Sequence, residues 1–283
     1  MGETKPGWNT SPEDAQSAIA EICRRTKCAV VGDAVSALAA IPGCLESFLS
    51  SMRPAFDSCR LESAARWVRD VGAAEAESVV RFSDHLRWLA DRDYSQDDTR
   101  QIRYIVEAFC NVEPVHAVLA ASAEAWLDGA TQSPVSLDTE CVAEETKADF
   151  TAEIRFVDGD GPPACLSPFD DRWGSPRHSF LRALAIWPPY VDRVWAELDP
   201  VLESAEYARA VSKIREGAER VSREMPISAI EPDLRAQYGT VIPYLKQCLN
   251  ASCHVLVVCS ALRSMFVAAE IDARSRRSTT DDS

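Results

Sequence analysis

The chain has 283 residues, enough to bury a sizeable core in one large domain or two smaller ones. Hydrophobic residues make up 46% and charged residues 26%, as in ordinary soluble globular proteins. The formal net charge of −14 repels phosphate backbones and anionic lipid, which argues against nucleic acid and membrane surfaces as partners. The polar N-terminus resembles no secretory signal, and the apolar run from His254 is too short to span a bilayer. We therefore expect a cytoplasmic protein.

The first part of the chain has a helical period throughout. After a flexible N-terminus over residues 1–14, apolar residues recur at i, i+3 and i+4 across residues 15–128. Ser11 followed by Pro12 is a standard helix entry, and Gly129 is a good C-cap. These signals predict a first helical repeat that ends near residue 128.

Residues 129–176 change character and are expected to connect two halves. The stretch "VDGDGPPACLSPFDDRWGSP" is so rich in Gly, Pro and Asp that it predicts no regular element. Helical spacing resumes over residues 177–270, and residues 271–283 are expected to be a disordered tail. No confident strand pair is found, so the predicted fold class is all-α.

Ten cysteines raise the possibility of disulfides or a metal site. None forms Cys-x-x-Cys, and no histidine falls at zinc-finger spacing from a cysteine pair. Most lie among apolar residues on helical stretches, where a free cysteine behaves as a small hydrophobe. The sequence therefore predicts reduced, buried thiols, no metal and no cofactor.

Two stretches of the chain nearly repeat one another. "ALAAIPGCLESFLSSMRPAFDS" over 37–58 and "ALAIWPPYVDRVWAELDPVLES" over 183–204 share six identities, including both prolines. The apolar positions between them also match in kind. The match predicts an internally duplicated helical pseudo-dimer with a small-molecule cleft between its two repeats. A homodimer is possible.

The Ala-Leu-Ala motif, the proline after it and the Trp-bearing helix resemble the group I 2-haloacid dehalogenases. That resemblance implies a pseudo-dimer of helical repeats, in which water activated by an aspartate displaces halide directly from the α-carbon. Counting back seven residues from Trp187 places that aspartate at Phe180, with Ser179 one residue away. Phe180 cannot accept a proton, so the chain is expected to be a divergent member that lacks the catalytic aspartate.

Other family positions keep polar residues. The resemblance implies that Ser58 and Glu62 preserve a hydroxyl–glutamate pair, and that a family asparagine has become Glu113. Glu62 could instead be a solvated helix residue between two arginines. Glu113 could instead be the first-turn acid of a helix. His178 is the best replacement base by position, because it lies close to Phe180 in sequence.

The remaining candidates are expected to bind substrate. The repeat aligns Asp33 with Ser179, so Asp33 could serve the site from the first half, although it could simply cap a helix. The other predicted binding residues are Phe180, Ser179, Trp187, Asn111, Asn250 and His254. The sequence thus predicts a small-molecule enzyme of lyase, isomerase or cyclase type that acts on an apolar organic substrate by acid–base or binding-driven chemistry. The alternatives are a hydrolytic 2-haloacid dehalogenase with a displaced base and a non-catalytic small-molecule-binding protein.

Overall fold

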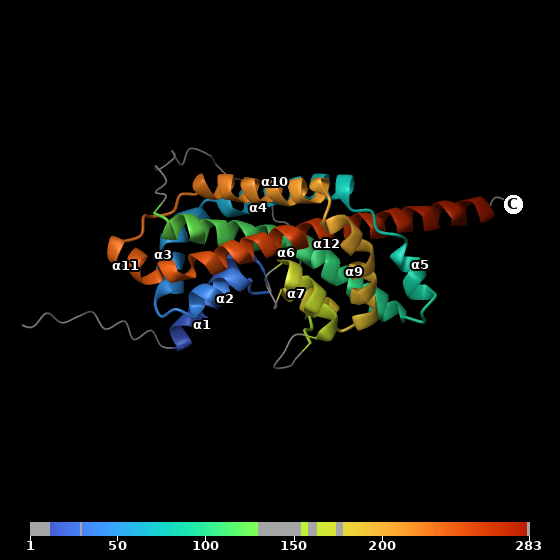
Figure 1. Ribbon diagram of the computed structural model, residues 1–283, viewed down its shortest axis with the longest axis horizontal. Helices are drawn as coiled ribbons and strands as arrows, with labels where there is room; N and C mark the ends of the chain where they lie inside the picture. The colour runs from blue at the N-terminus through green and yellow to red at the C-terminus, as the bar shows by residue number, and fades with distance from the viewer. Residues whose placement is uncertain (1–11, 29, 130–153, 158–162, 174–177, 282–283) are drawn as a thin grey trace, which may run out of the picture. The chain divides into compact units, whose positions relative to one another are not determined.

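The computed structural model describes residues 12–28, 30–129, 154–157, 163–173 and 178–281. Over these residues Figure 1 shows helices and connecting segments, and no strand. The predicted all-α class is therefore confirmed. The first group of helices is α1 (Pro12–Thr26), α2 (Asp33–Ala39), α3 (Cys44–Asp57), α4 (Arg60–Val79), α5 (His85–Ala90) and α6 (Gln96–Leu127). The second group is α7 (Ser167–Trp173), α8 (Ser179–Leu184), α9 (Pro188–Leu202), α10 (Ala205–Arg223), α11 (Pro232–Tyr238) and α12 (Ile242–Asp281), with 3₁₀ turns at Ala164–Leu166 and Gly239–Val241.

The described residues divide into two compact units. Unit 1 draws on Met1–Trp67, Val115–Ala152 and Glu216–Asn250, and unit 2 on Val68–Pro114, Glu153–Arg215 and Ala251–Ser283. Each unit thus takes segments from both predicted repeats. The predicted domain limits, which follow the repeats along the chain, stay a prediction.

The order of the helices agrees with the predicted duplication. The series α2 to α6 has lengths of 7, 14, 20, 6 and 32 residues, and the series α8 to α12 has lengths of 6, 15, 19, 7 and 40. Pro42 and Pro188 both lie where a short helix gives way to a longer one. The duplication itself stays a prediction until the two series are superposed.

Unit 1 contains the first three helices. α1 has acidic residues in its first turn and basic residues in its last, as the helix dipole favours. It packs on α2 and α3, and Arg25 of α1 donates to Asp57 of α3 at 2.6 Å. Phe48 of α3 lies 5.5 Å from Trp126 of α6, ring centre to ring centre. Large apolar side chains therefore anchor α3 in the core of this unit.

Unit 2 contains α5, α7, α8 and α9. Phe169 of α7 contacts Trp195 of α9, with ring centres 4.6 Å apart. The prediction that the stretch around α7 has no regular structure is wrong. Ser167 and Pro168 begin a helix, and the spacing of Leu166, Phe169 and Trp173 gives it one buried face.

Two other predictions concern the C-terminal part of the chain and the cysteines. The disordered tail predicted for 271–283 is wrong as far as Asp281, because α12 continues to that residue without a proline or glycine to end it.

Nine cysteines within the described residues carry thiols and no disulfide bond, and six of these are buried. This agrees with the predicted reduced thiols; Cys141 lies outside the described residues.

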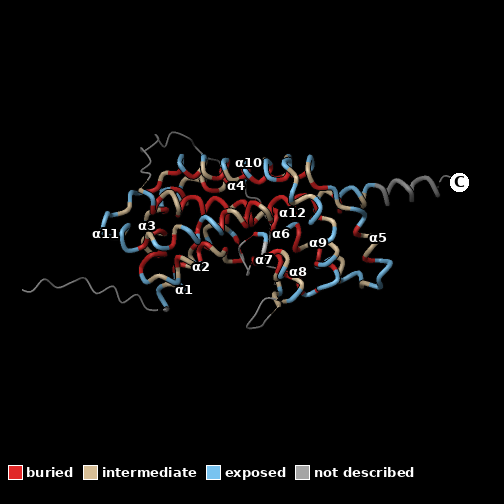
Figure 2. Tube along the Cα trace, in the orientation of Figure 1, coloured by how far each residue is buried: buried red, intermediate tan, exposed pale blue. Residues whose placement is uncertain are grey.

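One helical stretch, Pro232–Ile271, is long and apolar enough by length and composition to cross a membrane. However, 72% of its most apolar 18-residue window is buried within the protein. Figure 2 shows this burial along the first half of α12 and along α6. Such burial is typical of a core helix.

Gly72 allows close packing between two helices of unit 2. A Cβ atom at this position would lie 2.6 Å from Cγ and 2.7 Å from Cδ2 of Leu256, which is fully buried. We expect Gly72→Ala to lower the free energy of unfolding by about 1–3 kcal/mol through overpacking, even though alanine is about 1 kcal/mol the better helix former. Urea unfolding measures this. Gly239→Ala is the matched control, since its Cβ would meet no atom within 4 Å. A more stable Gly72→Ala variant would contradict the prediction.

Candidate active site

Unit 2 contains a buried pair of acid–base groups, Glu113 and His178. Nε2 of His178 lies 3.4 Å from Oε2 of Glu113. The exposed fractions are 5% for His178 and 0% for Glu113. Both residues are predicted as catalytic from the sequence, although they lie 65 positions apart in the chain. The structure brings them into contact.

Two helices position this pair. Glu113 lies within α6, and His178 is the N-cap residue of α8. One turn before Glu113, Phe109 packs edge-on against Phe180 with ring centres 5.3 Å apart. The aromatic contact and the acid–base contact thus join the same two segments. Pro114 has no N–H to donate to the carbonyl of Cys110, so the hydrogen-bond ladder of α6 is interrupted next to Glu113.

Two thiols belong to the same buried region. Burial, and then the neighbouring Cys110 thiol and Glu113, raise the pKa of Cys259 far above that of an ordinary thiol. A thiol with so high a pKa stays protonated at neutral pH, and the thiolate is the nucleophilic form. Cys259 is therefore poorly suited to act as a nucleophile at neutral pH.

A buried carboxyl–imidazole pair is suited to moving one proton. Burial disfavours a lone charge on either group, and each stabilises the charge of the other. When Nε2–H faces the Glu113 carboxylate, the lone pair of the imidazole lies on Nδ1. His178 can then accept a proton at Nδ1 while Glu113 stabilises the imidazolium. A general base with an orienting carboxylate uses the same two groups.

Three of the other predicted residues of unit 2, Phe180, Trp187 and Asn111, have identifiable partners. Phe180 is fully buried, and Ser179, the first residue of α8, is half-buried. Trp187 donates its indole N–H to Asp98 at 2.9 Å. Asn111 accepts from Arg69 at 3.1 Å and donates to the carbonyl of Glu107 at 2.9 Å. These contacts tie their helices together, and a role in binding substrate stays a prediction for each.

His254 lies between two aromatic rings. It stacks on Trp173 with ring centres 5.3 Å apart and an angle of 14° between the planes. The Tyr207 hydroxyl lies 3.0 Å from Nδ1 of His254. Burial, with a smaller effect from Arg215, lowers the pKa of His254 to about 4. His254 is therefore neutral at pH 7.

The remaining four predicted residues belong to unit 1. Ser58 donates to the carbonyl of Ala55 at the end of α3. The side chain of Glu62 is 40% exposed and lies 3.7 Å from Arg66, at the edge of the buried stripe of α4. Asp33 begins α2 after the N-cap residue Gly32, so it is not the cap itself. Asn250 is half-buried in α12. Their predicted catalytic or binding roles stay predictions.

Sequence reasoning missed a second buried histidine with a carboxylate. Nδ1 of His85 lies 3.2 Å from the Tyr190 hydroxyl, and Nε2 lies 3.4 Å from Glu197. Burial, partly opposed by Glu197, lowers the pKa of His85. Glu197 also accepts from the backbone and hydroxyl of Ser83 at 2.8 and 2.6 Å. This network fixes the segment before α5 to α9, and no local motif around His85 signals it.

No cluster of three or more His, Cys, Asp or Glu side chains that could hold a metal ion occurs within the described residues.

Comparison with known proteins supports the resemblance seen in the sequence. No protein-family profile matches the chain. It is 25% identical over 197 residues to an (R)-2-haloacid dehalogenase of Rhizobium sp. (strain NHG3), covering 65% of this chain and 73% of that protein. A complex of D-2-haloacid dehalogenase with L-LA matches with a TM-score of 0.61 at 16% identity over 91% of both chains. A mutant of D-2-haloacid dehalogenase with D-2-CPA matches with a TM-score of 0.60 at 17% identity, again over 91% of both chains.

The fold is thus the helical fold of these solved structures. The chain is similar in sequence to a 2-haloacid dehalogenase, in agreement with the resemblance that its motifs predict.

Proposed function

We propose that this protein is a hydrolase of the 2-haloacid dehalogenase type in which His178, oriented by Glu113, activates the attacking water. The observation that carries the proposal is the 3.4 Å contact between these two buried side chains. The family resemblance requires a base close to the position of Phe180, and His178 is two residues away. His178 therefore fills the role for which Phe180 has no suitable group.

The reaction proceeds by direct displacement. A water molecule gives one proton to Nδ1 of His178 as its oxygen forms a bond to the α-carbon of the haloacid. The carbon–halogen bond breaks with its electron pair on the departing halide, and the product is the 2-hydroxy acid. Glu113 stabilises the imidazolium during this step, and the surrounding apolar side chains, including Phe109 and Phe180, strengthen that interaction by excluding bulk water.

The choice of hydrolysis over other acid–base chemistry rests on the relatives. The proteins matched above are named as dehalogenases. The lyase, isomerase or cyclase chemistry first predicted from the sequence finds no support among them. The loss of the family aspartate led to that first prediction, and a buried replacement base removes the reason for it.

Release of halide from the two enantiomers of 2-chloropropionate tests the proposal. We expect the wild-type protein to release chloride from at least one enantiomer and to form lactate in equal amount. His178→Asn should lower kcat by about 10²–10⁴, the usual contribution of a general base. Ion chromatography on purified protein measures both products.

His116→Asn provides a matched control. His116 is also buried, but its Nε2 lies 3.2 Å from the carbonyl oxygen of Val30 in unit 1. We expect this variant to retain kcat if it folds, as judged by circular dichroism. Absence of chloride release from both enantiomers by folded wild-type protein would overturn the proposal, as would full activity in His178→Asn.

A further inference from the structure

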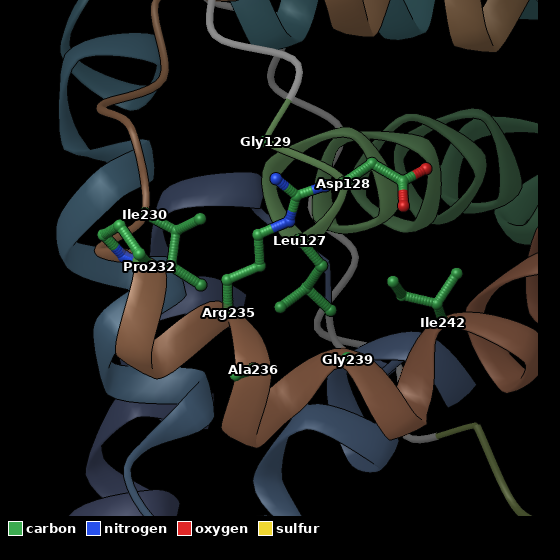
Figure 3. Close-up of a pocket in the computed structure, with 9 residues that line it drawn as sticks. All are labelled: Leu127, Asp128, Gly129, Ile230, Pro232, Arg235, Ala236, Gly239 and Ile242. Atoms are coloured by element: carbon green, nitrogen blue, oxygen red, sulfur yellow. The ribbon is translucent and has the colours of Figure 1, made fainter.

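Unit 1 contains a pocket of about 610 Å³ where the end of α6 meets α11 and the start of α12. Figure 3 shows its lining residues, which are Leu127, Asp128, Gly129, Ile230, Pro232, Arg235, Ala236, Gly239 and Ile242. None of them belongs to the Glu113–His178 pair. Its volume is within the range of about 300–1,000 Å³ typical of small-molecule sites.

Small residues and a sharp turn create this space. Gly129 adopts a left-handed conformation, with φ of 67°, two residues after the end of α6. At Gly239, where α11 ends, an added Cβ would meet no atom within 4 Å. Ala236 contributes only a methyl group to the lining. The pocket is therefore open beside Gly239, whereas the side chain of Arg235 occupies the space beside Gly129.

Arg235 supplies a positive charge to this pocket. Its guanidinium packs against Gly129, where an added Cβ would lie 2.7 Å from a terminal nitrogen. No acidic side chain forms an ion pair with Arg235 within the described residues, although the chain carries a net charge of −14. In Figure 3 the Asp128 carboxylate points away from the guanidinium. Arg235 thus has donors available for an anion.

Apolar side chains line the same pocket. Leu127 comes from α6, Ile230 precedes α11, and Ile242 begins α12. A ligand that matches this lining has one anionic group and a hydrocarbon part. A carboxylate suits Arg235 because the planar guanidinium can bind both of its oxygens. A dianion such as phosphate suits the pocket less well, because Asp128 also lines it.

We propose that this pocket binds a small amphiphilic carboxylate, with its carboxylate on Arg235 and its hydrocarbon chain against Leu127, Ile230 and Ile242. The site is independent of the proposed hydrolysis, since its residues and its ligand contacts are separate from the acid–base pair. It gives the protein a second site for organic acids.

Isothermal titration calorimetry with octanoate tests this site. Wild-type protein should bind octanoate saturably with one site per chain, and octanamide, its neutral analogue, at least 10-fold more weakly. Arg235→Gln should weaken octanoate binding at least 10-fold. Gly239→Phe should abolish binding, because Gly239 lines the pocket and a Cβ there would meet no atom within 4 Å, which leaves room for a ring that competes with the ligand. Arg223→Gln, on the exposed surface of α10 in the same unit, should bind octanoate as the wild type does.

Three results would overturn the proposal. One is the absence of saturable octanoate binding to folded wild-type protein, and another is unchanged affinity in Arg235→Gln. The third is a lower melting temperature in Arg235→Gln without any effect of octanoate on the wild type, which would mean that Arg235 only stabilises the end of α6. Because the assay measures binding and not halide release, failure of this proposal leaves the hydrolase proposal intact.

Discussion

Replacement of Glu113 by glutamine should lower kcat for halide release by about 10²–10⁴ while the protein remains folded. Glutamine has nearly the same shape and still offers an oxygen toward Nε2 of His178. It carries no charge, however, so the imidazolium that forms during water activation loses its stabilising partner. In the proposed mechanism Glu113 therefore acts through His178 as a positioning residue.

Measuring the stability of Glu113→Gln distinguishes a loss of catalysis from a loss of folded structure. Loss of the carboxylate leaves His178 free to stay neutral, so no uncompensated charge remains buried. We expect the free energy of unfolding to change by less than about 1 kcal/mol. The double variant Glu113→Gln/His178→Asn should be no slower than the slower single variant, because residues that act as a unit are not additive.

Glu107→Gln is the matched control for this series. Glu107 lies on the same helix, but its side chain is 51% exposed and pairs with Arg263 at 2.7 Å. An exposed ion pair of this kind contributes about 0–1 kcal/mol, so the control should keep both activity and stability. Loss of activity in Glu107→Gln equal to that in Glu113→Gln would contradict the assignment.

The sequence was most informative where a pattern is local. Helical spacing and the caps at Pro12 and Gly129 predict helices that the structure contains. The failure at α7 has a local cause as well. This stretch contains a Ser-Pro helix start and three apolar residues at helical spacing. Glycines and prolines lie on both sides of it, and they predict turns instead of a helix.

The candidate site was predictable only in part. Both members of the Glu113–His178 pair could be named, because the family resemblance indicated Glu113 and proximity to Phe180 indicated His178. Their contact could not be predicted, since it depends on how α8 packs on α6. The His85 network shows the same limit: Tyr190 and Glu197 lie more than 100 residues further along the chain, and no spacing rule connects them to His85.

Acidification should destabilise this protein because His254 is held neutral in the folded state. Its pKa is lowered from 6.5 to about 4 by burial and then by Arg215. Between these two values the unfolded chain binds a proton that the folded protein does not bind. The stabilisation is therefore fully present above about pH 6.5, and it is lost progressively as the pH falls toward 4. This shift in pKa corresponds to a change of about 3 kcal/mol in the free energy of unfolding.

His254→Gln should remove most of this pH dependence of the free energy of unfolding. Glutamine cannot titrate, but its oxygen can still accept from the Tyr207 hydroxyl, which His254 contacts at 3.0 Å. Loss of the stacking on Trp173 should lower stability at pH 7 by about 1–2 kcal/mol. Urea unfolding at several pH values between 4 and 7 separates the two effects, because the stacking loss is the same at every pH. A residual slope is expected, since burial also lowers the pKa of His85. Parallel curves for the two proteins would show that His254 is not the group responsible, and the buried His85 would then be the next to replace.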